Sequence, residues 1–378
     1  MKITSEPITI GIIGGGQLCR MMCEAASPLG FRVVFLDPTS SAPAESVAHK
    51  QITGDFDSAE DIQKLLDHAD YLTYDIELAD PDSIDALEPS VPVHPAPETL
   101  RMIQDKLNQK QQLKKRGIPV PDFVRVDSID DLYEAQKQFG LPMMLKARMG
   151  GYDGRGNLFL DSEDDFEEAL ETLSTNAMVE ELIDFDRELS IIGVKGTDGT
   201  EVFPVTETVH EEEILRHTIT PARTTDEIKD RAREVARDVL EVMTGRGVYG
   251  IELFETDGKI LVNEIAPRPH NSGHWTIEGA VTSQFEQHLR AVTGCPLGST
   301  RLREPTVSVN ILGDKGERPV SLEGIEALFE TPDAHFHWYG KELERPLRKM
   351  GHFTVTGDDT EQVLNKALDL CGELSFKP

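Results

Sequence analysis

The chain has 378 residues, of which 38 are Lys or Arg and 68 are Asp or Glu, so its formal net charge is −30. The length suits two or three domains, and the acidic excess excludes a nucleic-acid backbone or an anionic membrane as partner, because both would be repelled. Concentrated salt would screen this self-repulsion, since the Debye length is ~3 Å at ~1 M. We therefore predict a salt-adapted (halophilic) protein, with an ordinary acidic enzyme as the alternative.

Cysteine use and hydropathy indicate a cytoplasmic protein. The four cysteines form no CxxC motif, and Cys19 and Cys23 share a helix face without further metal ligands nearby, so we expect buried thiols. The sequence has no run of 18 consecutive apolar residues and no charged N-terminal segment followed by an apolar one. We therefore expect a cytoplasmic location and no membrane partner.

The N-terminal segment predicts a βαβ unit. A buried strand (8–13) runs into GGGQ, a helix (17–30) and a second strand (31–37). We expect a phosphate or ribose at this glycine turn, next to the helix N-terminus. Read as GxGxxG, the turn has Cys19 where the third glycine belongs, and Asp37 follows about 20 residues on, which leaves a nicotinamide oxidoreductase as a weak alternative. A helix near 58–68, a strand (71–77) and a long helix (98–116) complete this region.

A glycine-rich segment in the middle of the chain indicates a nucleotide grip. Strands 142–148 and 157–160 are predicted to form a hairpin around KARMGGYDGRG, with Lys146 on the first strand. Backbone N–H groups of such a loop can close over phosphate oxygens without a Cβ in the way. The alternative is a mobile surface turn. A helix (163–173) follows, then strands at 177–183 and 187–196, which we expect to pair and which carry EELI and RELS, and a strand at 201–210.

A second hairpin indicates a metal site. After a charged helix (225–243), strands 247–255 and 260–267 are joined by an Asp-Gly turn. A two-residue turn would put Glu252 opposite Asn263, so Glu264 shares that face only if the register shifts. Two carboxylates in a phosphate site suit Mg²⁺, and solvated strand faces are the alternative. A helix (280–293) ends this part.

The last 80 residues predict short strands (306–312, 335–340, 351–357) and a helix near 360–371. They also contain the dense basic cluster Lys341, Arg345, Arg348 and Lys349. A cation cluster in so acidic a chain suggests an anionic group such as a phosphate. Surface salt bridging is the alternative.

Together these motifs resemble the ATP-grasp superfamily. Within it, GGGQL-RM, LTYDIE, KARMGGYDGRG, NEIAPRPHNSGHWT and WYGK-x(6)-RKMGH resemble the N5-carboxyaminoimidazole ribonucleotide synthetase family from about residue 8 to 370. The resemblance implies an α/β (α+β) fold with a Rossmann-like parallel-sheet domain (1–105), an ATP-grasp domain (106–298) and a small C-terminal domain (299–378). It also implies a homodimer.

The resemblance implies site residues as well. ATP would be held by Lys106, Lys146, Gly150, Gly151, Tyr152, Asp153, Gly154, Arg155, Gly156, Glu180, Glu181, Leu182, Ile183, Glu188, His210, Asn263 and Glu264. Mg²⁺ would be held by Glu252 and Glu264. The ribonucleotide would be held by Glu77, His270, Asn271, Ser272, Lys341 and Arg348, and the catalytic set would be Tyr152, Asp153, Arg155 and Arg268. Cys19, Asp75, Leu78 and Ala79 depart from the usual family residues.

The implied reaction is carboxylation of aminoimidazole ribonucleotide with ATP and bicarbonate through carboxyphosphate, in a pocket closed against water. Carboxyphosphate or released CO₂ is the electrophile, and phosphate or Asp153 accepts the amine proton; the sequence leaves both choices open. The rival functions are the formate-dependent glycinamide ribonucleotide transformylase, a nicotinamide oxidoreductase and a non-catalytic nucleotide sensor.

Overall fold

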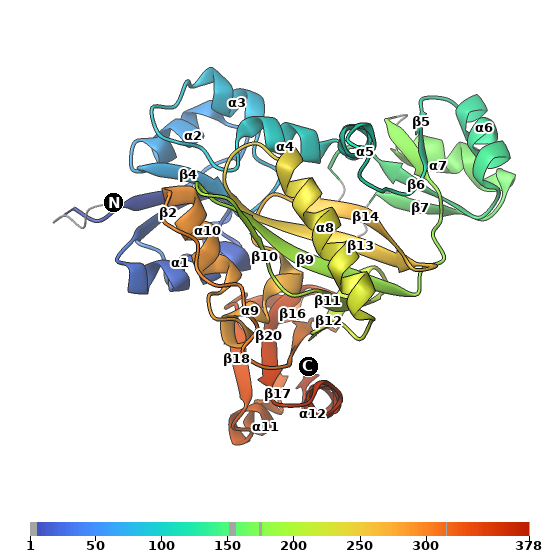
Figure 1. Cartoon of the computed structure of the whole chain (residues 1–378). Helices are drawn as coiled ribbons and strands as arrows, with labels where there is room; N and C mark the ends of the chain where they lie inside the picture. The colour runs from blue at the N-terminus through green and yellow to red at the C-terminus, as the bar shows by residue number, and fades with distance from the viewer. Residues whose placement is uncertain (1–5, 151–155, 174–175, 315, 378) are drawn as a thin grey trace.

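The computed structural model describes residues 6–150, 156–173, 176–314 and 316–377. Three bodies are visible in Figure 1: an N-terminal body in blue, a small lobe in green, and a long central sheet that continues into the red C-terminal part. Among the described residues, no helix is both long and apolar enough to cross a membrane.

The N-terminal body is the predicted parallel sheet. Its strand order is β3-β2-β1-β4, with all neighbours parallel. The strands are β1 (Thr9–Ile13), β2 (Arg32–Asp37), β3 (Lys50–Thr53) and β4 (Tyr71–Tyr74), and the helices are α1 (Gln17–Ala26), α2 (Ala59–Leu66) and α3 (Pro81–Ala86). Ile10, Ile12 and Phe35 pack with α1 in one cluster, and Leu65 and Leu72 pack in another. The sheet thus buries both faces, as a parallel sheet must.

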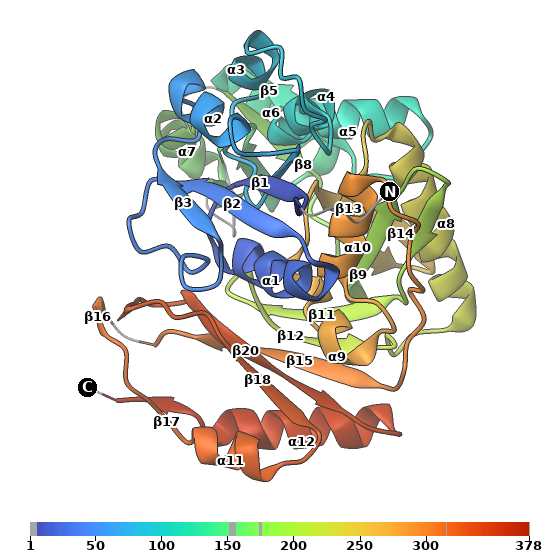
Figure 2. The ribbon, with the colours of Figure 1, turned by 90° about the vertical axis from the view of Figure 1, so that its left-hand side faces the viewer.

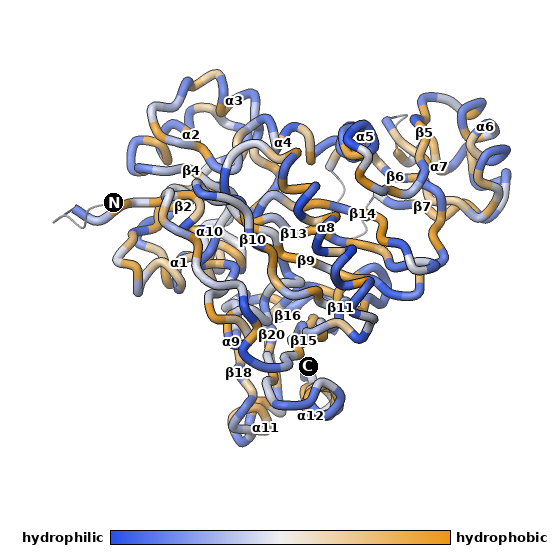
Figure 3. Tube along the Cα trace, in the orientation of Figure 1, coloured by the Kyte–Doolittle hydropathy of each residue, from blue (hydrophilic) through white to orange (hydrophobic). Residues whose placement is uncertain are grey.

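The helix expected at 98–116 is in fact two helices, α4 (Pro97–Gln104) and α5 (Lys106–Lys115). Asp105 between them has extended backbone angles and accepts hydrogen bonds from the N–H groups of Leu107 and Asn108. Its side chain also pairs with Arg148. This N-cap restarts the helix and sets the direction of α5. The sequence of α5 is hydrophilic over most of its length (Figure 3).

The small lobe is an antiparallel sheet of order β5-β8-β6-β7. Its elements are β5 (Phe123–Val126), α6 (Ile129–Phe139), β6 (Met143–Ala147), β7 (Asn157–Leu160), α7 (Phe166–Leu173) and β8 (Ala177–Glu180). The predicted hairpin is confirmed, since β6 pairs with β7 and Lys146 lies opposite Asn157. The expected pairing of EELI with RELS is wrong. β8 ends at Glu180 and belongs to the small lobe, whereas β9 (Arg187–Lys195) belongs to the central sheet.

The central sheet is antiparallel and has the order β14-β13-β9-β11-β12-β15-β20-β18, with β10 beside β9. Its other strands are β10 (Thr200–Val202), β11 (Thr206–Glu211), β12 (Ile214–Thr220), β13 (Gly247–Thr256), β14 (Lys259–Ala266), β15 (Thr306–Leu312), β18 (Ala334–Trp338) and β20 (Lys349–Thr356). Helix α8 (Asp226–Val242) packs on β9, β13 and β14. Because β12 pairs with β15, backbone hydrogen bonds join the C-terminal part to the middle of the chain.

The helices after β14 pack against the central sheet. They are α9 (Thr276–Gly279), α10 (Gln284–Thr293), α11 (Ile325–Glu330) and α12 (Thr360–Glu373), and the remaining short strands are β16 (Arg318–Pro319), β17 (Leu322–Glu323), β19 (Leu343–Glu344) and β21 (Ser375–Phe376). Figure 2 shows α11 and α12 below the strands β15, β18 and β20. Helix α10 begins four residues later than predicted because Ser283 caps it, accepting from Glu286 N–H at 3.2 Å. All four cysteines are free thiols; Cys19 and Cys23 are buried as expected, whereas Cys295 and Cys371 are partly exposed, so the expectation is wrong for these two.

Candidate functional site

Lysine and glutamate side chains meet where the small lobe faces the central sheet. Lys146 on β6 and Lys110 on α5 both contact Glu180 at the end of β8, with Nζ–Oε distances of 2.7 Å each. Lys106, the first residue of α5, reaches Glu264 on β14 at 2.9 Å. The glutamate expected to frame adenine therefore uses its side chain to hold two ammonium groups. Lys110 was not predicted as a site residue.

These charges shift one another's pKa values. Burial would raise the pKa of Glu180, but Lys110 and Lys146 bring it down to about 2. Burial lowers the pKa of Lys110 to about 8, since Glu180 only partly offsets burial and the repulsion from Lys146 and Lys106. Two cations sharing one buried anion leave an excess positive charge. Such a group is suited to binding polyphosphate.

The expected metal carboxylates lie opposite each other. Glu252 on β13 pairs with Glu264 on β14, and the register shifts directly after Glu252, where Leu253 pairs with Val262. Asn263 is the extra residue of this β-bulge. The turn at Asp257 and Gly258 has two residues, both with positive φ. The register shift that Glu264 needs in order to share the face of Glu252 is thus present, and it places Glu264 opposite Glu252.

The two carboxylates differ in their electrostatic surroundings. Burial and the charge of Glu264 raise the pKa of Glu252 to about 6. Glu264 is partly exposed, and although its partial burial acts to raise its pKa, Lys106, followed by Lys146 and Lys110, holds that pKa below the usual value. Among the described residues no lysine forms a salt bridge with Glu252, which therefore faces a like charge that a bound cation would relieve.

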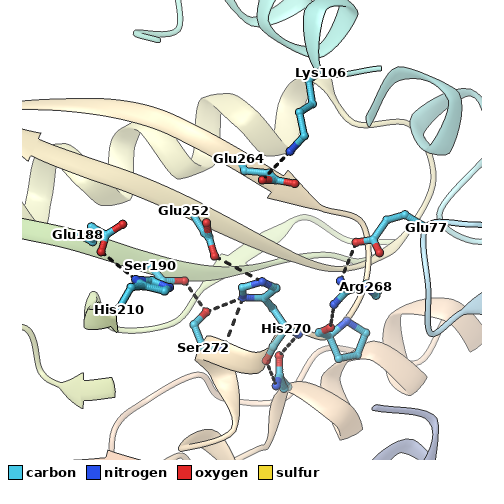
Figure 4. Close-up of polar contacts among 12 residues, drawn as sticks. Glu77, Lys106, Glu188, Ser190, His210, Glu252, Glu264, Arg268, His270 and Ser272 are labelled. Carbon is cyan, nitrogen blue, oxygen red and sulfur yellow. Dashed lines mark hydrogen bonds and ion pairs between the residues drawn. The ribbon is translucent and has the colours of Figure 1, made fainter. Parts of the chain in front are cut away.

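Glu188 and His210, expected beside the ribose, lie on adjacent strands β9 and β11. His210 Nδ1 and Glu188 Oε2 are 2.8 Å apart, and this contact outweighs burial to raise the pKa of His210. Figure 4 shows them on the same face of the sheet as Glu252 and Glu264. Glu181, Leu182 and Ile183 form the connection from β8 to β9, and Glu181 N–H donates to Asp122 O at 2.8 Å.

The residues expected at the ribonucleotide lie beside this array (Figure 4). Arg268, after β14, pairs with Glu77, after β4, at 2.8 Å. His270 Nδ1 is 2.8 Å from Ser272 Oγ, which is 2.6 Å from Ser190 Oγ, while His270 Nε2 lies 3.6 Å from Glu252. Ser190 was not predicted.

Asn271 completes this group. Both polar atoms of its side chain are buried, and no described residue is their hydrogen-bond partner. A buried amide without partners is costly inside a protein. A ligand with a donor and an acceptor would satisfy it.

The basic cluster divides into two parts. Arg345 pairs with Glu317 at the surface, at 2.7 Å, so the salt-bridging alternative holds for this residue. Lys341 instead points toward α1, where its Nζ is 3.1 Å from Gln17 Oε1 and 2.6 Å from Lys349 O. Arg348 donates to Leu343 O at 2.5 Å, and burial together with Arg345 lowers its pKa.

A phosphate or ribose at the first glycine turn, as expected from the sequence, would have to compete with carboxylates of the protein itself. Gly15 N–H donates to Asp37 Oδ2 at 2.9 Å and Gly16 N–H to Asp75 Oδ2 at 2.5 Å, so the protein's own carboxylates take the anion position at the start of α1. A Cβ at Gly15 would lie 2.4 Å from Phe35, so the turn needs glycine for close packing. Sequence spacing could not reveal this, because Asp75 lies 59 residues from Gly16.

The loop residues Gly151, Tyr152, Asp153, Gly154 and Arg155 lie outside the described residues. Gly150 and Gly156 flank them, both with positive φ. Within the described part of the chain, no three His, Cys, Asp or Glu side chains form a metal-binding group. Mg²⁺ commonly uses one or two carboxylates with phosphate oxygens and water, a set that Glu252 and Glu264 can begin.

Three regions of the chain match known domain families. Residues 8–104 match the ribonucleotide synthetase preATP-grasp domain, residues 111–285 the ATP-grasp domain, and residues 306–366 the phosphoribosylaminoimidazole carboxylase C-terminal domain.

Curated relatives match along nearly the whole chain. The N5-carboxyaminoimidazole ribonucleotide synthase of Staphylococcus epidermidis is 35% identical over 359 residues, covering 94% of each protein. The phosphoribosylaminoimidazole carboxylase of Candida albicans is 39% identical over 386 residues, covering 98% of this chain and 67% of that protein. Further fungal and plant carboxylases are covered over 63 to 66% of their length. The chain thus spans about two thirds of these longer relatives.

Solved structures match equally well. The N5-carboxyaminoimidazole ribonucleotide synthetase of Thermotoga maritima has a TM-score of 0.89 and 42% identity, covering 98% of this chain and 99% of that one. The N5-carboxyaminoimidazole synthase of Aspergillus clavatus, in complex with ADP and 5-aminoimidazole ribonucleotide, has a TM-score of 0.90 and 35% identity, covering 97% and 98%.

Proposed function

Because the chain belongs to the N5-carboxyaminoimidazole ribonucleotide synthase family, we propose that it carboxylates 5-aminoimidazole ribonucleotide with ATP and bicarbonate, releasing ADP and phosphate, in purine biosynthesis. The observation that carries this proposal is one continuous polar array. Its lysines and paired carboxylates suit a nucleotide, and beside them Arg268, His270 and Asn271 suit a second substrate.

In this proposal ATP lies between the small lobe and the central sheet. Lys106 and Lys146 contact its phosphates, and the loop from Gly150 to Gly156 closes over them. Glu181, Leu182 and Ile183 line the adenine, with Glu180 behind them. Glu188 and His210 hold the ribose, and Asn263 lies on the bulge that presents Glu264. The support is that Glu188, His210 and Glu264 lie on one face of the central sheet, with Lys106 reaching Glu264.

Glu252 and Glu264 would hold Mg²⁺. The residues fit the ion, because two facing carboxylates, one with a raised pKa, offer hard oxygen ligands whose repulsion a dication removes. When bound, Mg²⁺ would neutralise charge on the transferring phosphoryl group.

The ribonucleotide lies between the N-terminal body and the central sheet. Glu77, Arg268, His270, Asn271 and Ser272 surround its base and ribose. Lys341 and Arg348 take its 5′-phosphate, with Tyr152, Asp153 and Arg155 of the loop completing the site. Support comes from the Arg268–Glu77 contact, which joins the two bodies, and from Lys341, which reaches α1.

The reaction proceeds in two steps. A bicarbonate oxygen attacks the γ-phosphorus of ATP, which releases ADP and gives carboxyphosphate, a better electrophile than bicarbonate. The exocyclic amine then forms the C–N bond to carboxyphosphate or to the CO₂ released from it, phosphate leaves and the amine loses a proton. Lysines around the transferring phosphoryl group stabilise its charge, and closure of the loop keeps water from the intermediate.

An isotope experiment tests this proposal against its rival. With ¹⁸O-bicarbonate, one labelled oxygen is expected in the inorganic phosphate formed during turnover with aminoimidazole ribonucleotide. A formate-dependent glycinamide ribonucleotide transformylase would form phosphate without bicarbonate and without this label. Unlabelled phosphate would therefore refute the carboxyphosphate route.

We also propose that the protein is a cytoplasmic homodimer adapted to salt. The dimer rests on family resemblance, and salt adaptation rests on the net charge of −30. Sedimentation of the purified protein tests the dimer, and the mass of a monomer would contradict it. Maximal thermal stability without added salt would contradict the adaptation to salt.

A further inference from the structure

Glu180 is held by two lysines of unequal accessibility. The side chains of Lys110 and Glu180 are each 3% exposed, whereas that of Lys146 is 16% exposed. Lys110 also donates to Val262 O at 3.0 Å, one residue before the bulge at Asn263. Lys110 thus links helix α5 to the small lobe through Glu180 and to the central sheet through Val262. Its ammonium group is buried and is not exposed to the proposed ATP site.

The proposed function, on which this inference rests, requires Lys146 to leave Glu180. Its Nζ is now 2.7 Å from Glu180 Oε2 and must turn to a phosphate when ATP binds. If Lys146 were the only counter-ion of Glu180, its departure would leave a buried charge unpaired, which is strongly unfavourable. Lys110 keeps its contact to the other carboxylate oxygen, so Glu180 remains neutralised after Lys146 departs.

We propose that Lys110 is a positioning residue for ATP binding, which fixes and neutralises Glu180 so that Lys146 can move to the nucleotide phosphates. Lys110 contacts neither ATP nor the ribonucleotide. Its effect is on the affinity for ATP, and it acts through the side chain of Glu180, which it contacts.

A variant series separates this role from a merely structural ion pair. The variants are Lys110→Met, Glu180→Gln, the double variant, and Lys114→Met as control. Lys114 lies one turn further along the same helix and pairs with Asp122 at the surface, with a side chain 57% exposed. Calorimetric titration with ATP alone gives the dissociation constant, and thermal melting reports the fold.

Lys110→Met is expected to weaken ATP binding about 10-fold or more, because the departure of Lys146 then leaves the buried Glu180 carboxylate without a counter-ion. Lys114→Met is expected to stay within about 2-fold of the wild type. The double variant is expected to bind ATP more tightly than Lys110→Met, since no buried carboxylate then competes for Lys146. The KM for the ribonucleotide is expected to stay unchanged throughout.

A structural ion pair predicts a different pattern. Lys110→Met would then lower the melting temperature without weakening ATP binding, or the double variant would bind no better than Lys110→Met, and either result overturns the proposal. If Lys110→Met does not fold, the double variant decides, and its failure to bind ATP overturns the proposal. A wild-type protein that bound no ATP would instead refute the proposed function.

Discussion

Exchange of one carboxylate of the facing pair is expected to stabilise the metal-free protein. Glu252 and Glu264 occupy matched positions, but Glu264 has Lys106 at 2.9 Å while Glu252 faces the charge of Glu264. Glu252→Gln removes that repulsion and keeps the shape of the side chain. The same exchange at Glu264 removes the counter-ion of Lys106.

The size of the effect follows from the pKa of Glu252, which burial and Glu264 raise from 4.5 to about 6. A shift of ~1.5 units at ~1.4 kcal/mol per unit makes the ionised carboxylate cost about 2 kcal/mol, and less where solvent reaches it. The folded pKa of this acid lies above the unfolded one. Its cost is therefore full above about pH 6 and disappears below about pH 4.5.

Urea unfolding with a chelator present, near pH 8, is the assay. Glu252→Gln is expected to raise the free energy of unfolding by about 1–2 kcal/mol, and the gain should vanish near pH 4. Glu264→Gln is expected to lower it by up to about 1 kcal/mol, because it leaves Lys106 without its nearest partner in an ion pair that is only partly buried. A less stable Glu252→Gln protein near pH 8, or shifts of the same sign in both variants, would show that repulsion between the two carboxylates does not destabilise the metal-free protein.

Two further predictions concern other parts of the molecule. Lys341→Ala should raise the KM for the ribonucleotide about 10-fold or more, because a charge-assisted hydrogen bond to phosphate is lost. The KM for ATP should change little. Equal changes in both KM values, measured by steady-state kinetics, would contradict the phosphate assignment. Burial and Arg246 lower the pKa of His94 to about 4, so its neutral form stabilises the fold above about pH 6.5, and up to ~3 kcal/mol is lost as the pH falls toward 4. His94→Gln should flatten the dependence of the urea midpoint on pH in that range, and an unchanged slope would count against this assignment.

The fold class and much of the site could be predicted because their signals are local or carried by long motifs. The predicted class, an α/β ATP-grasp fold with an N-terminal parallel sheet and a C-terminal domain, is confirmed. The Asp257–Gly258 turn fixes the register of its hairpin, and counting residues from it already required a shift to bring Glu264 opposite Glu252. The bulge at Asn263 provides that shift.

Contacts between distant segments could not be predicted in the same way. Lys110 lies 70 residues from Glu180, and its only sequence signal is its position one turn after Lys106 on α5. The division of helix 98–116 depends on Asp105, which binds Arg148 from another segment. A polar residue inside a helical pattern indicates a cap only when its tertiary partner is known.

The glycine turn after β1 is a second case in which distant segments supply the partners. Its sequence pattern indicates an anion at a helix N-terminus, and an anion is indeed there. The anions are the carboxylates of Asp37 and Asp75, the second of which directly follows β4, the strand beside β1 in the sheet. The sequence pattern indicates an anion at this helix N-terminus, but it does not distinguish a bound phosphate from a side-chain carboxylate.

The most direct test of the proposed function is ADP release in the presence of Mg²⁺, ATP and bicarbonate, measured with and without aminoimidazole ribonucleotide at several salt concentrations. ADP formation is expected to rise sharply when the ribonucleotide is added, to fall when bicarbonate is removed, and to accompany a labile carboxylated product. ADP release that is indifferent to the ribonucleotide would contradict the assigned substrate.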